Sequence, residues 1–179
     1  MKKFSGFALI LTISIALIAV AGTSQSCTYK FTESQPLPDS IKTVKVEIIE
    51  NRAPYQNPQL SPALTDRLRQ KIVNQTKLSQ TNNDNAHMLI RGTITDYSVS
   101  TSGITSSGGR SETSINRLTV TVNVVLIRQL ENKPEESYTV TRQFDFRSTQ
   151  SLQQAEAGLL DEMVRNLTDE IFNSIFSKW

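Results

Sequence analysis

The chain has 179 residues, of which 37% are hydrophobic and 20% charged, a composition ordinary for a globular protein with one domain and a substantial core. Its formal net charge of +2 comes from Lys2 and Lys3, because the remaining 17 basic residues (19 minus 2) balance 17 acidic ones. That balance excludes the bulk positive charge on which nucleic-acid binding depends, so we expect no nucleic-acid partner. One cysteine and one histidine exclude an internal disulfide, a multi-cysteine metal site and a paired-histidine metal site, so we expect no metal and no cofactor.

The first 27 residues have the features of an export signal. A positive start at 1–3 precedes an uncharged apolar run at 7–22, and small polar residues then lead to Cys27, the only cysteine. A basic start, a short apolar run and small residues before a break are typical of a secretory signal peptide. A lone cysteine at that break further indicates a lipoprotein signal, in which the thiol is acylated and becomes the new N-terminus. We predict a signal peptide at 1–26 and lipid attachment at Cys27.

Two other interpretations of this stretch stay open. Plain secretion would leave Cys27 as an unpaired thiol in an oxidising compartment, which secreted proteins usually avoid. An uncleaved anchor needs about 20 apolar residues, and this run is somewhat shorter. Bacterial lipoproteins typically carry a small residue just before the cysteine, as Ser26 is, and an aliphatic residue three places before it, where this chain has Ser24. We prefer lipidation because the residues before Cys27 match that pattern in part.

The stretch 27–40 is polar and carries Pro36 and Pro38, so we interpret it as a tether between the lipidated residue and the folded domain at 41–179. The first strand is expected at 41–49, where apolar and polar residues alternate. After a proline-containing loop, Ser61 and Pro62 indicate a helix start, because serine can cap and proline lacks an amide that the first turn does not use. Apolar residues then recur every four positions and predict an amphipathic helix over 62–75.

The second strand is expected at 87–99, with Met88, Ile90 and Ile94 on one face and Tyr97 on the other. Gly92 lies inside this strand and is a candidate bulge position. The stretch 98–114 is rich in serine, threonine and glycine, and its length indicates function or disorder. We predict a long hairpin there, with a flexible tip at 106–110.

The strongest strand pattern is 118–127, in which alternate residues form an unbroken apolar face. A turn with Pro134 leads to the fourth strand at 137–147. The last element is a helix over 152–177, opened by a capping box formed by Ser151 and Gln154. At 1.5 Å per residue it would reach about 38 Å, so its C-terminal end, with Phe172 and Phe176, should overhang the sheet.

The order of elements is therefore β-α-β-β-β-α. A helix between the first two strands permits a parallel crossover, and the three later strands can form a meander. Each strand has one apolar face, which calls for helices on that side only. We predict an α+β fold, a two-layer sandwich with two helices on one face of a four-stranded mixed sheet.

A search for chemistry finds no catalytic constellation. His87 stands at a strand start with no nucleophile motif, since no G-x-S-x-G is present, and a lone histidine in such a place is most often structural. Ser107-Gly108-Gly109 is too short for a phosphate-binding loop, which should follow a buried strand and open a helix. We expect no catalytic residues and no enzyme activity.

Arg110 and Arg117 flank the long loop and Lys133 lies in the opposite turn, which makes these three residues the candidates for ligand binding. A guanidinium fork matches two oxygens of a phosphate. The simpler interpretation is that they are loop charges that keep the protein soluble.

The chain resembles the LptE family, the lipoproteins of the lipopolysaccharide assembly machinery of Gram-negative outer membranes. The likeness covers essentially the whole mature chain. It rests on the order and spacing of these segments: CTYKF at the cysteine, IKTVKVEII, PQLSPALTDRLRQKI, AHMLIRGTITDYSVS, LTVTVNVVL, SYTVTRQFDF and the long terminal helix.

The resemblance implies a protein held by its acylated cysteine in the inner leaflet of the outer membrane, on the periplasmic side. Family members plug the β-barrel translocon LptD, assist its assembly and bind lipopolysaccharide, and they are not enzymes. The alternative is a lipoprotein that acts alone and binds a small ligand or an envelope polymer. A secreted hydrolase of unrecognised type is a third hypothesis, which an activity lost on His87→Ala would support.

Overall fold

In the computed structural model, residues 37–102, 115–131 and 133–177 are described, and all of them belong to the unit Ser34–Trp179. The predicted hairpin tip at 106–110, Cys27 and the tether up to residue 36 lie outside the described residues. The elements in chain order are β1 (Thr43–Val46), β2 (Glu50–Asn51), α2 (Leu60–Gln75), β3 (Ser79–Gln80), β4 (Met88–Ser102), β5 (Ile115–Arg128), β6 (Glu136–Arg147) and α3 (Leu152–Phe176).

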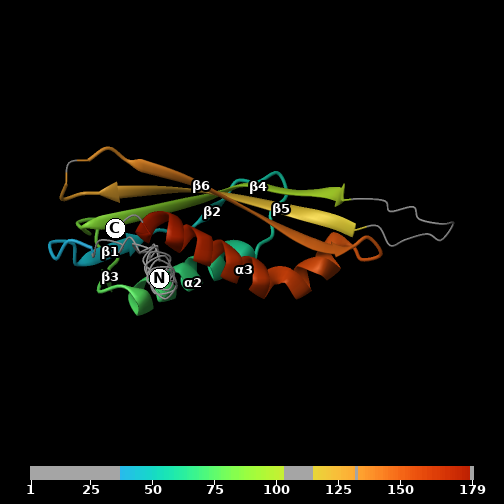
Figure 1. The fold of residues 1–179 in the computed structure, drawn as a ribbon, viewed down its shortest axis with the longest axis horizontal. Coiled ribbons are helices and arrows are strands. Elements are labelled where there is room, and N and C mark those ends of the chain that lie inside the picture. The colour runs from blue at the N-terminus through green and yellow to red at the C-terminus, as the bar shows by residue number, and fades with distance from the viewer. Residues whose placement is uncertain (1–36, 103–114, 132, 178–179) are drawn as a thin grey trace, which may run out of the picture. The chain divides into compact units, whose positions relative to one another are not determined.

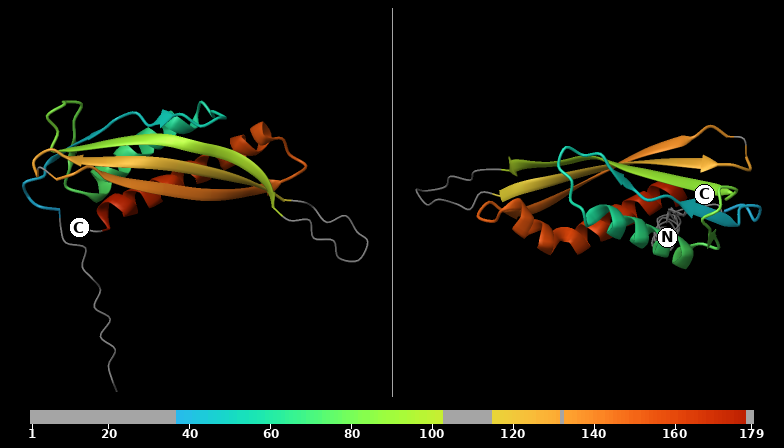
Figure 2. Two further views of the ribbon diagram at one scale, coloured as in Figure 1. Left: turned by 90° about the horizontal axis from the view of Figure 1, so that it is seen from above. Right: turned by 180° about the vertical axis from the view of Figure 1, so that it is seen from behind.

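One mixed sheet carries all the strands, in the order β3-β1-β4-β5-β6, with β2 also paired to β4 (Figures 1 and 2). β1 runs parallel to β4, and β4, β5 and β6 form an antiparallel meander, so both predicted connections are confirmed. The predicted number of four strands is wrong, because the sheet has six. The two additional strands, β2 and β3, have two residues each and lie in polar stretches, where no alternation could reveal them.

Both helices lie on the same side of the sheet (Figure 1), which confirms the predicted two-layer arrangement. The sheet contributes the even-numbered residues of β5 from Leu118 to Leu126, all at most 1% exposed. The helices contribute apolar residues at helical spacing, which are fully buried: Leu60, Leu64, Leu68 and Ile72 from α2, and Met163, Leu167, Ile171 and Ile175 from α3. Burial of apolar side chains at roughly 1.5–3 kcal/mol each makes this single core the main source of stability.

The start of α2 differs from the prediction. The helix begins at Leu60 after the N-cap Gln59, and no side chain caps it. Ser61 lies inside the first turn, where its hydroxyl donates to the carbonyl of Ile49 instead of capping. In α3, by contrast, the capping box is confirmed: the Gln154 amide donates to Ser151 Oγ at 3.3 Å, and the Ser151 amide donates to Gln154 Oε1 at 3.1 Å.

The C-terminal end of α3 is more protected than expected. Phe176 is 8% exposed, and its ring centroid lies 4.7 Å from that of Phe172. Lys71 of α2 places its ammonium group 5.1 Å from the centroid of the Phe172 ring. Lys71 of α2 therefore helps to cover Phe172, and Phe172 in turn lies against Phe176.

The bulge in β4 lies at Thr95, not at Gly92 as predicted. The register against β5 shifts between Ile94 and Asp96, so one extra residue enters β4. An extra residue reverses the alternation beyond it. As a result Tyr97, expected on the outer face, turns to the helix-covered face and is only 3% exposed.

Gly92 instead permits close packing of the segment after β1. A Cβ atom built on Gly92 would lie 2.8 Å from Cγ1 of Ile49, a buried side chain. Because Cγ1 is close to the backbone, it cannot move away cheaply. Ile49 therefore leaves no room for a side chain at position 92.

We predict that Gly92→Ala destabilises the protein by about 1–3 kcal/mol, since the added methyl group overpacks a filled core. Urea unfolding monitored by circular dichroism measures the change. The matched control is Gly158→Ala in α3, where a Cβ atom meets nothing within 4 Å; this change should stabilise by about 0.5–1 kcal/mol through helix propensity. Ile49→Ala should relieve the clash, so a double variant whose loss equals the sum of the two single losses would contradict this account.

Candidate functional site

Two of the predicted ligand-binding residues are already ion-paired within the chain. Arg117 on β5 binds Asp145 on β6 through two bonds, from Nε at 2.7 Å and from Nη2 at 2.9 Å. This hydrogen-bonded pairing raises the pKa of Arg117 and lowers that of Asp145. Lys133 places its ammonium group 2.8 Å from the carboxylate of Glu131. Arg110 and the predicted lipid-attachment residue Cys27 lie outside the described residues.

The structure does not bring Arg117 and Lys133 together. Arg117 lies opposite Asp145 near one end of the β5–β6 ladder, and Lys133 follows Arg128 in the turn at the other end. Eleven strand residues at about 3.3 Å each separate residues 117 and 128 by roughly 36 Å. A single small ligand cannot reach both residues.

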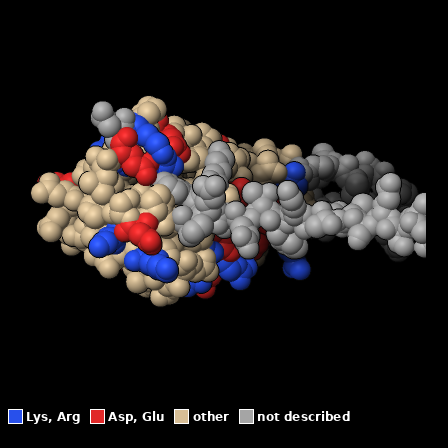
Figure 3. Space-filling view, turned by 60° about the vertical axis from the view of Figure 1, so that its left-hand side comes forward, with Lys and Arg blue, Asp and Glu red and all other residues tan. Residues whose placement is uncertain are grey.

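Charges of both signs are mixed on the surface. On the face that Figure 3 shows, acidic and basic groups adjoin one another. Ion pairs within the chain join charges of opposite sign: Lys45 with Asp84, Arg91 with Glu47, Arg128 with Glu136, and Arg142 with Glu170. Ion pairs of this kind on a surface are individually weak.

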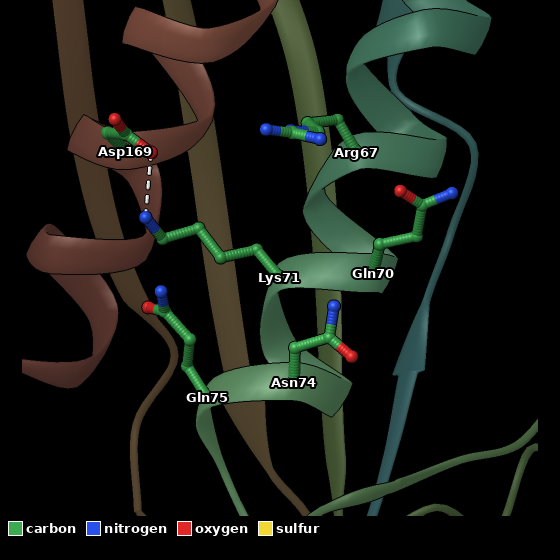
Figure 4. A pocket seen from close by; sticks show the side chains of 6 residues that line it. All are labelled: Arg67, Gln70, Lys71, Asn74, Gln75 and Asp169. Carbon is green, nitrogen blue, oxygen red and sulfur yellow. Dashed lines mark hydrogen bonds and ion pairs between the residues drawn. The ribbon is translucent and has the colours of Figure 1, made fainter.

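A polar hollow of about 160 Å³ lies between α2 and α3 (Figure 4). Its lining comes from the outward face of α2 and one residue of α3: Arg67, Gln70, Lys71, Asn74, Gln75 and Asp169. Lys71 Nζ lies 2.6 Å from Asp169 Oδ1 and ties the two helices together. In the sequence this face is a series of polar residues on an amphipathic helix, and the i, i+4 spacing of Arg67 and Lys71 is its only signal.

Hydrogen-bond donors dominate the hollow. Arg67 and Lys71 supply cationic N–H groups and three carboxamides supply more, whereas Asp169 is the one carboxylate. Within the described part of the chain, no ion pair engages the Arg67 guanidinium. The hollow can therefore accept a small, oxygen-rich group such as a hydroxylated or phosphorylated sugar.

A buried polar cluster joins the loop before α2 to β4 and α3. The hydroxyl of Tyr97 donates to Glu156 Oε1 at 2.7 Å, and that of Tyr55 donates to Glu156 Oε2 at 3.2 Å. The two tyrosine rings stack with centroids 5.4 Å apart, and Glu156 is only 9% exposed. Asn57, 4% exposed, completes the cluster and binds the amide of Gln59 at 2.9 Å. The bulge at Thr95 is what presents Tyr97 to this cluster.

Burial and hydrogen bonds to carboxylates keep two phenols protonated. Burial first, and then the hydrogen bond to Glu156, raises the pKa of Tyr97 far above its ordinary value. Burial and the hydrogen bond to Glu136 raise the pKa of Tyr138 to about 12. In the unfolded chain both phenols ionise near pH 10.

We predict that the protein loses stability between about pH 10 and pH 12. Above pH 10 the unfolded state binds fewer protons than the folded state, so the free energy of unfolding falls as pH rises. Urea unfolding at pH 8, 10 and 11 measures the slope. The double variant Tyr97→Phe with Tyr138→Phe should show a shallower slope than the wild type; equal slopes would show that these phenols do not cause the loss.

The centre of the β5–β6 ladder carries no charge on the outer face of the sheet, opposite α2 and α3. It consists of short hydroxyl and amide side chains that point away from the helices: Thr119, Thr121, Asn123, Thr139, Thr141 and Gln143. Neighbours hydrogen-bond across strands, with Thr121 and Thr141 hydroxyls 3.1 Å apart and Ser137 Oγ 2.9 Å from Asn123 Oδ1. The result is a polar surface that is uncharged on the central parts of β5 and β6, with Asp96 of β4 beside Thr121.

His87 has structural contacts. Its Nδ1 accepts the backbone amide of Lys42 at 2.9 Å, and its own amide donates to Thr43 Oγ1 at 3.0 Å, so it joins the starts of β1 and β4. Among the described residues, no group of three or more His, Cys, Asp or Glu residues is arranged to hold a metal ion. The helices of the described segments are too short or too polar to span a membrane.

Comparison with known proteins begins with the fold. A minor lipoprotein from Acinetobacter baumannii superposes with a TM-score of 0.50 and 17% identity, covering 77% of this chain and 94% of its own. A protein described as a homolog of neuraminyllactose-binding hemagglutinin from Helicobacter pylori gives a TM-score of 0.51 and 13% identity, covering 80% and 89%. At these identities the likeness shows the fold alone. A search of curated proteins finds no match.

The fold thus defines a two-layer α+β domain with two helices on one face of a mixed sheet. The family model described as "LptE: Lipopolysaccharide-assembly" matches residues 41–175, which include every strand and helix of the described residues except the last residue of α3. The chain belongs to the LptE family, as its sequence segments indicated.

Proposed function

We propose that this protein is an outer-membrane lipoprotein, anchored on the periplasmic side through acylated Cys27. In this proposal it plugs and helps assemble an LptD-type β-barrel translocon and takes part in lipopolysaccharide transport to the cell surface. It acts by binding and not as an enzyme. The single observation that carries the proposal is the family match over residues 41–175.

The outer face of the sheet supports the role of a plug. The interior of an outer-membrane barrel is polar, so a domain held inside it needs a polar surface that carries little net charge. The central residues of this face, from Thr119 to Asn123 on β5 and from Thr139 to Gln143 on β6, have short neutral side chains. Such side chains lose little rotamer entropy when they are buried against a partner.

Arg110, Arg117 and Lys133 remain our proposed contacts for lipopolysaccharide. Arg117 lies on the exposed outer face, and its fork is now occupied by Asp145. A phosphate group matches the same two N–H vectors, so it would have to displace the carboxylate. Because Arg117 and Lys133 lie at opposite ends of β5 and β6, we propose that they contact different parts of one extended ligand.

Copurification tests the proposed function. A tagged copy of the full chain, recovered from detergent-solubilised outer membranes, should carry a β-barrel protein with it in fixed proportion. An unrelated outer-membrane lipoprotein with the same tag controls for barrels that bind non-specifically. Recovery of the chain alone would contradict the proposal.

The hollow between α2 and α3 supports the alternative, a lipoprotein that acts alone and binds a small ligand or envelope polymer. Its donors would recognise sugar hydroxyls or phosphates without any barrel. A ligand that binds the folded state raises its thermal unfolding temperature. Stabilisation of the isolated chain by an envelope saccharide, lost in Arg67→Ala, would favour this alternative.

A further inference from the structure

The strand β6 forms one edge of the sheet. It is last in the strand order, paired with β5 on one side only, and no strand of the described segments lies on its other side (Figure 2, left). Its register against β5 runs without a shift from Arg147 to Glu136. A regular edge of this length presents a row of N–H and C=O groups to which another strand can bind.

Little in β6 blocks such pairing. Edge strands are usually protected by proline, lysine, a bulge or a charge that points inward. The sequence ESYTVTRQFDFR contains neither proline nor lysine. Two charges of β6, Arg142 and Glu136, lie on the face that the helices cover. Arg142 is ion-paired to Glu170 of α3 and Glu136 to Arg128 of β5, so both charges are satisfied within the chain.

We propose that β6 pairs antiparallel with β6 of a second copy of this chain, with Thr141 opposite Thr141. The two-fold axis of such a pair is perpendicular to the sheet. Residues directly opposite each other therefore lie on the same face of the sheet, and their residue numbers differ by an even number. Only two registers of this kind pair essentially the whole strand, centred on Thr141 or on Arg142. Centring on Arg142 would set two guanidinium groups opposite each other, which is unfavourable.

The register centred on Thr141 is self-complementary. On the outer face, Thr139 lies opposite Gln143 of the second copy, and Glu135, the residue just before β6, comes opposite its Arg147. On the helix-covered face, Tyr138 lies opposite Phe144 of the second copy. Each pair occurs twice by symmetry, no like charges meet, and cross-strand ionic and aromatic pairs of this kind stabilise antiparallel sheets. This inference concerns the chain outside a barrel and does not rest on the proposed function.

Disulfide crosslinking tests the register. In Thr141→Cys the two cysteines would lie about 4.5–5.5 Å apart between Cα atoms, within the range of a disulfide. The matched control is Thr121→Cys, because Thr121 lies beside Thr141 on the same face but one strand inward. Its two copies would be three strand spacings apart, about 14 Å, too far to bridge.

We expect mild oxidation of the purified full chain to give a disulfide-linked dimer for Thr141→Cys and not for Thr121→Cys. Peptide mapping must find residue 141 of both copies in the link, which separates it from any link through Cys27; the wild type gives that background. Absence of the 141–141 link, or an equal yield from Thr121→Cys, overturns the proposal.

Charge reversal tests the interface in solution. Sedimentation equilibrium should give twice the mass of one chain for the wild type. Glu135→Arg or Arg147→Glu alone should lower the association constant roughly tenfold, because two attractive pairs become repulsive. The double variant should restore it, with circular dichroism confirming that every variant is folded. A monomeric wild type, or a double variant no better than the single ones, overturns the proposal.

Discussion

Replacing Cys27 by serine is expected to abolish membrane retention while the folded domain keeps its stability. In the proposed function acylation supplies the anchor, since each buried methylene group contributes about 0.8 kcal/mol of membrane binding. A serine has no thiol and cannot form the thioether through which a lipoprotein carries its lipid. The core should be unaffected because its residues all lie between Ile41 and Phe176, in a unit separate from Met1–Glu33, which contains Cys27.

Fractionation of cells that express Cys27→Ser tests this expectation, together with mass spectrometry of the mature N-terminus. Ser26→Ala is the matched control, because alanine is also small and should leave processing and membrane retention intact. The free energy of unfolding of the released chain should equal that of the wild-type domain. Continued association of Cys27→Ser with membranes would show instead that the apolar run at 7–22 is an uncleaved anchor.

The elements with long, regular patterns could be predicted from the sequence. The apolar face of β5, from Leu118 to Leu126, and the stripe of α3 both extend over many residues, and each is buried as its period requires. The capping box at Ser151 is a local interaction, so it too could be predicted. From these features alone the two-layer α+β arrangement follows.

The remaining features depend on partners far apart in the sequence. The bulge at Thr95 places Tyr97 in the core, and nothing near it in the chain shows this, because its partners are Tyr55 and Glu156. Ser61 has the right chemistry for a cap, but it lies inside the first turn and its hydroxyl donates to the carbonyl of Ile49.

The candidate site shows the same limitation. Arg117 and Lys133 were chosen because both lie in or near loops, but a position along the chain does not give a register. The register of β5 against β6 sets Arg117 beside Asp145 and leaves Lys133 at the far end of the ladder. The hollow on α2 was missed because its residues, such as Arg67 and Lys71, look like an ordinary solvated helix face until α3 is placed beside them.

Glu156 is the residue outside the apolar core whose loss should cost the most stability. Its carboxylate is 9% exposed and accepts hydrogen bonds from Tyr97 and Tyr55, while no Lys or Arg of the described segments forms an ion pair with it. A buried carboxylate without a cation depends on its hydrogen-bond donors. Tyr97, 3% exposed, depends in turn on Glu156, the carboxylate partner of its hydroxyl, while Asn57 and, at 4.0 Å, the sulfur of Met163 are its other partners.

We expect Glu156→Ala to lower the free energy of unfolding by about 2–4 kcal/mol, because it takes the carboxylate away from the buried Tyr97 hydroxyl, removes two charge-assisted hydrogen bonds and leaves a cavity. Glu156→Gln is the matched control: its amide keeps the shape and one acceptor, so its loss should be only about 1 kcal/mol. Urea unfolding at pH 7 measures both. Adding Tyr97→Phe to Glu156→Ala should recover part of the lost free energy of unfolding, since the buried Tyr97 hydroxyl is then absent. A Glu156→Ala variant within about 0.5 kcal/mol of the wild type would show that this cluster is dispensable for folding.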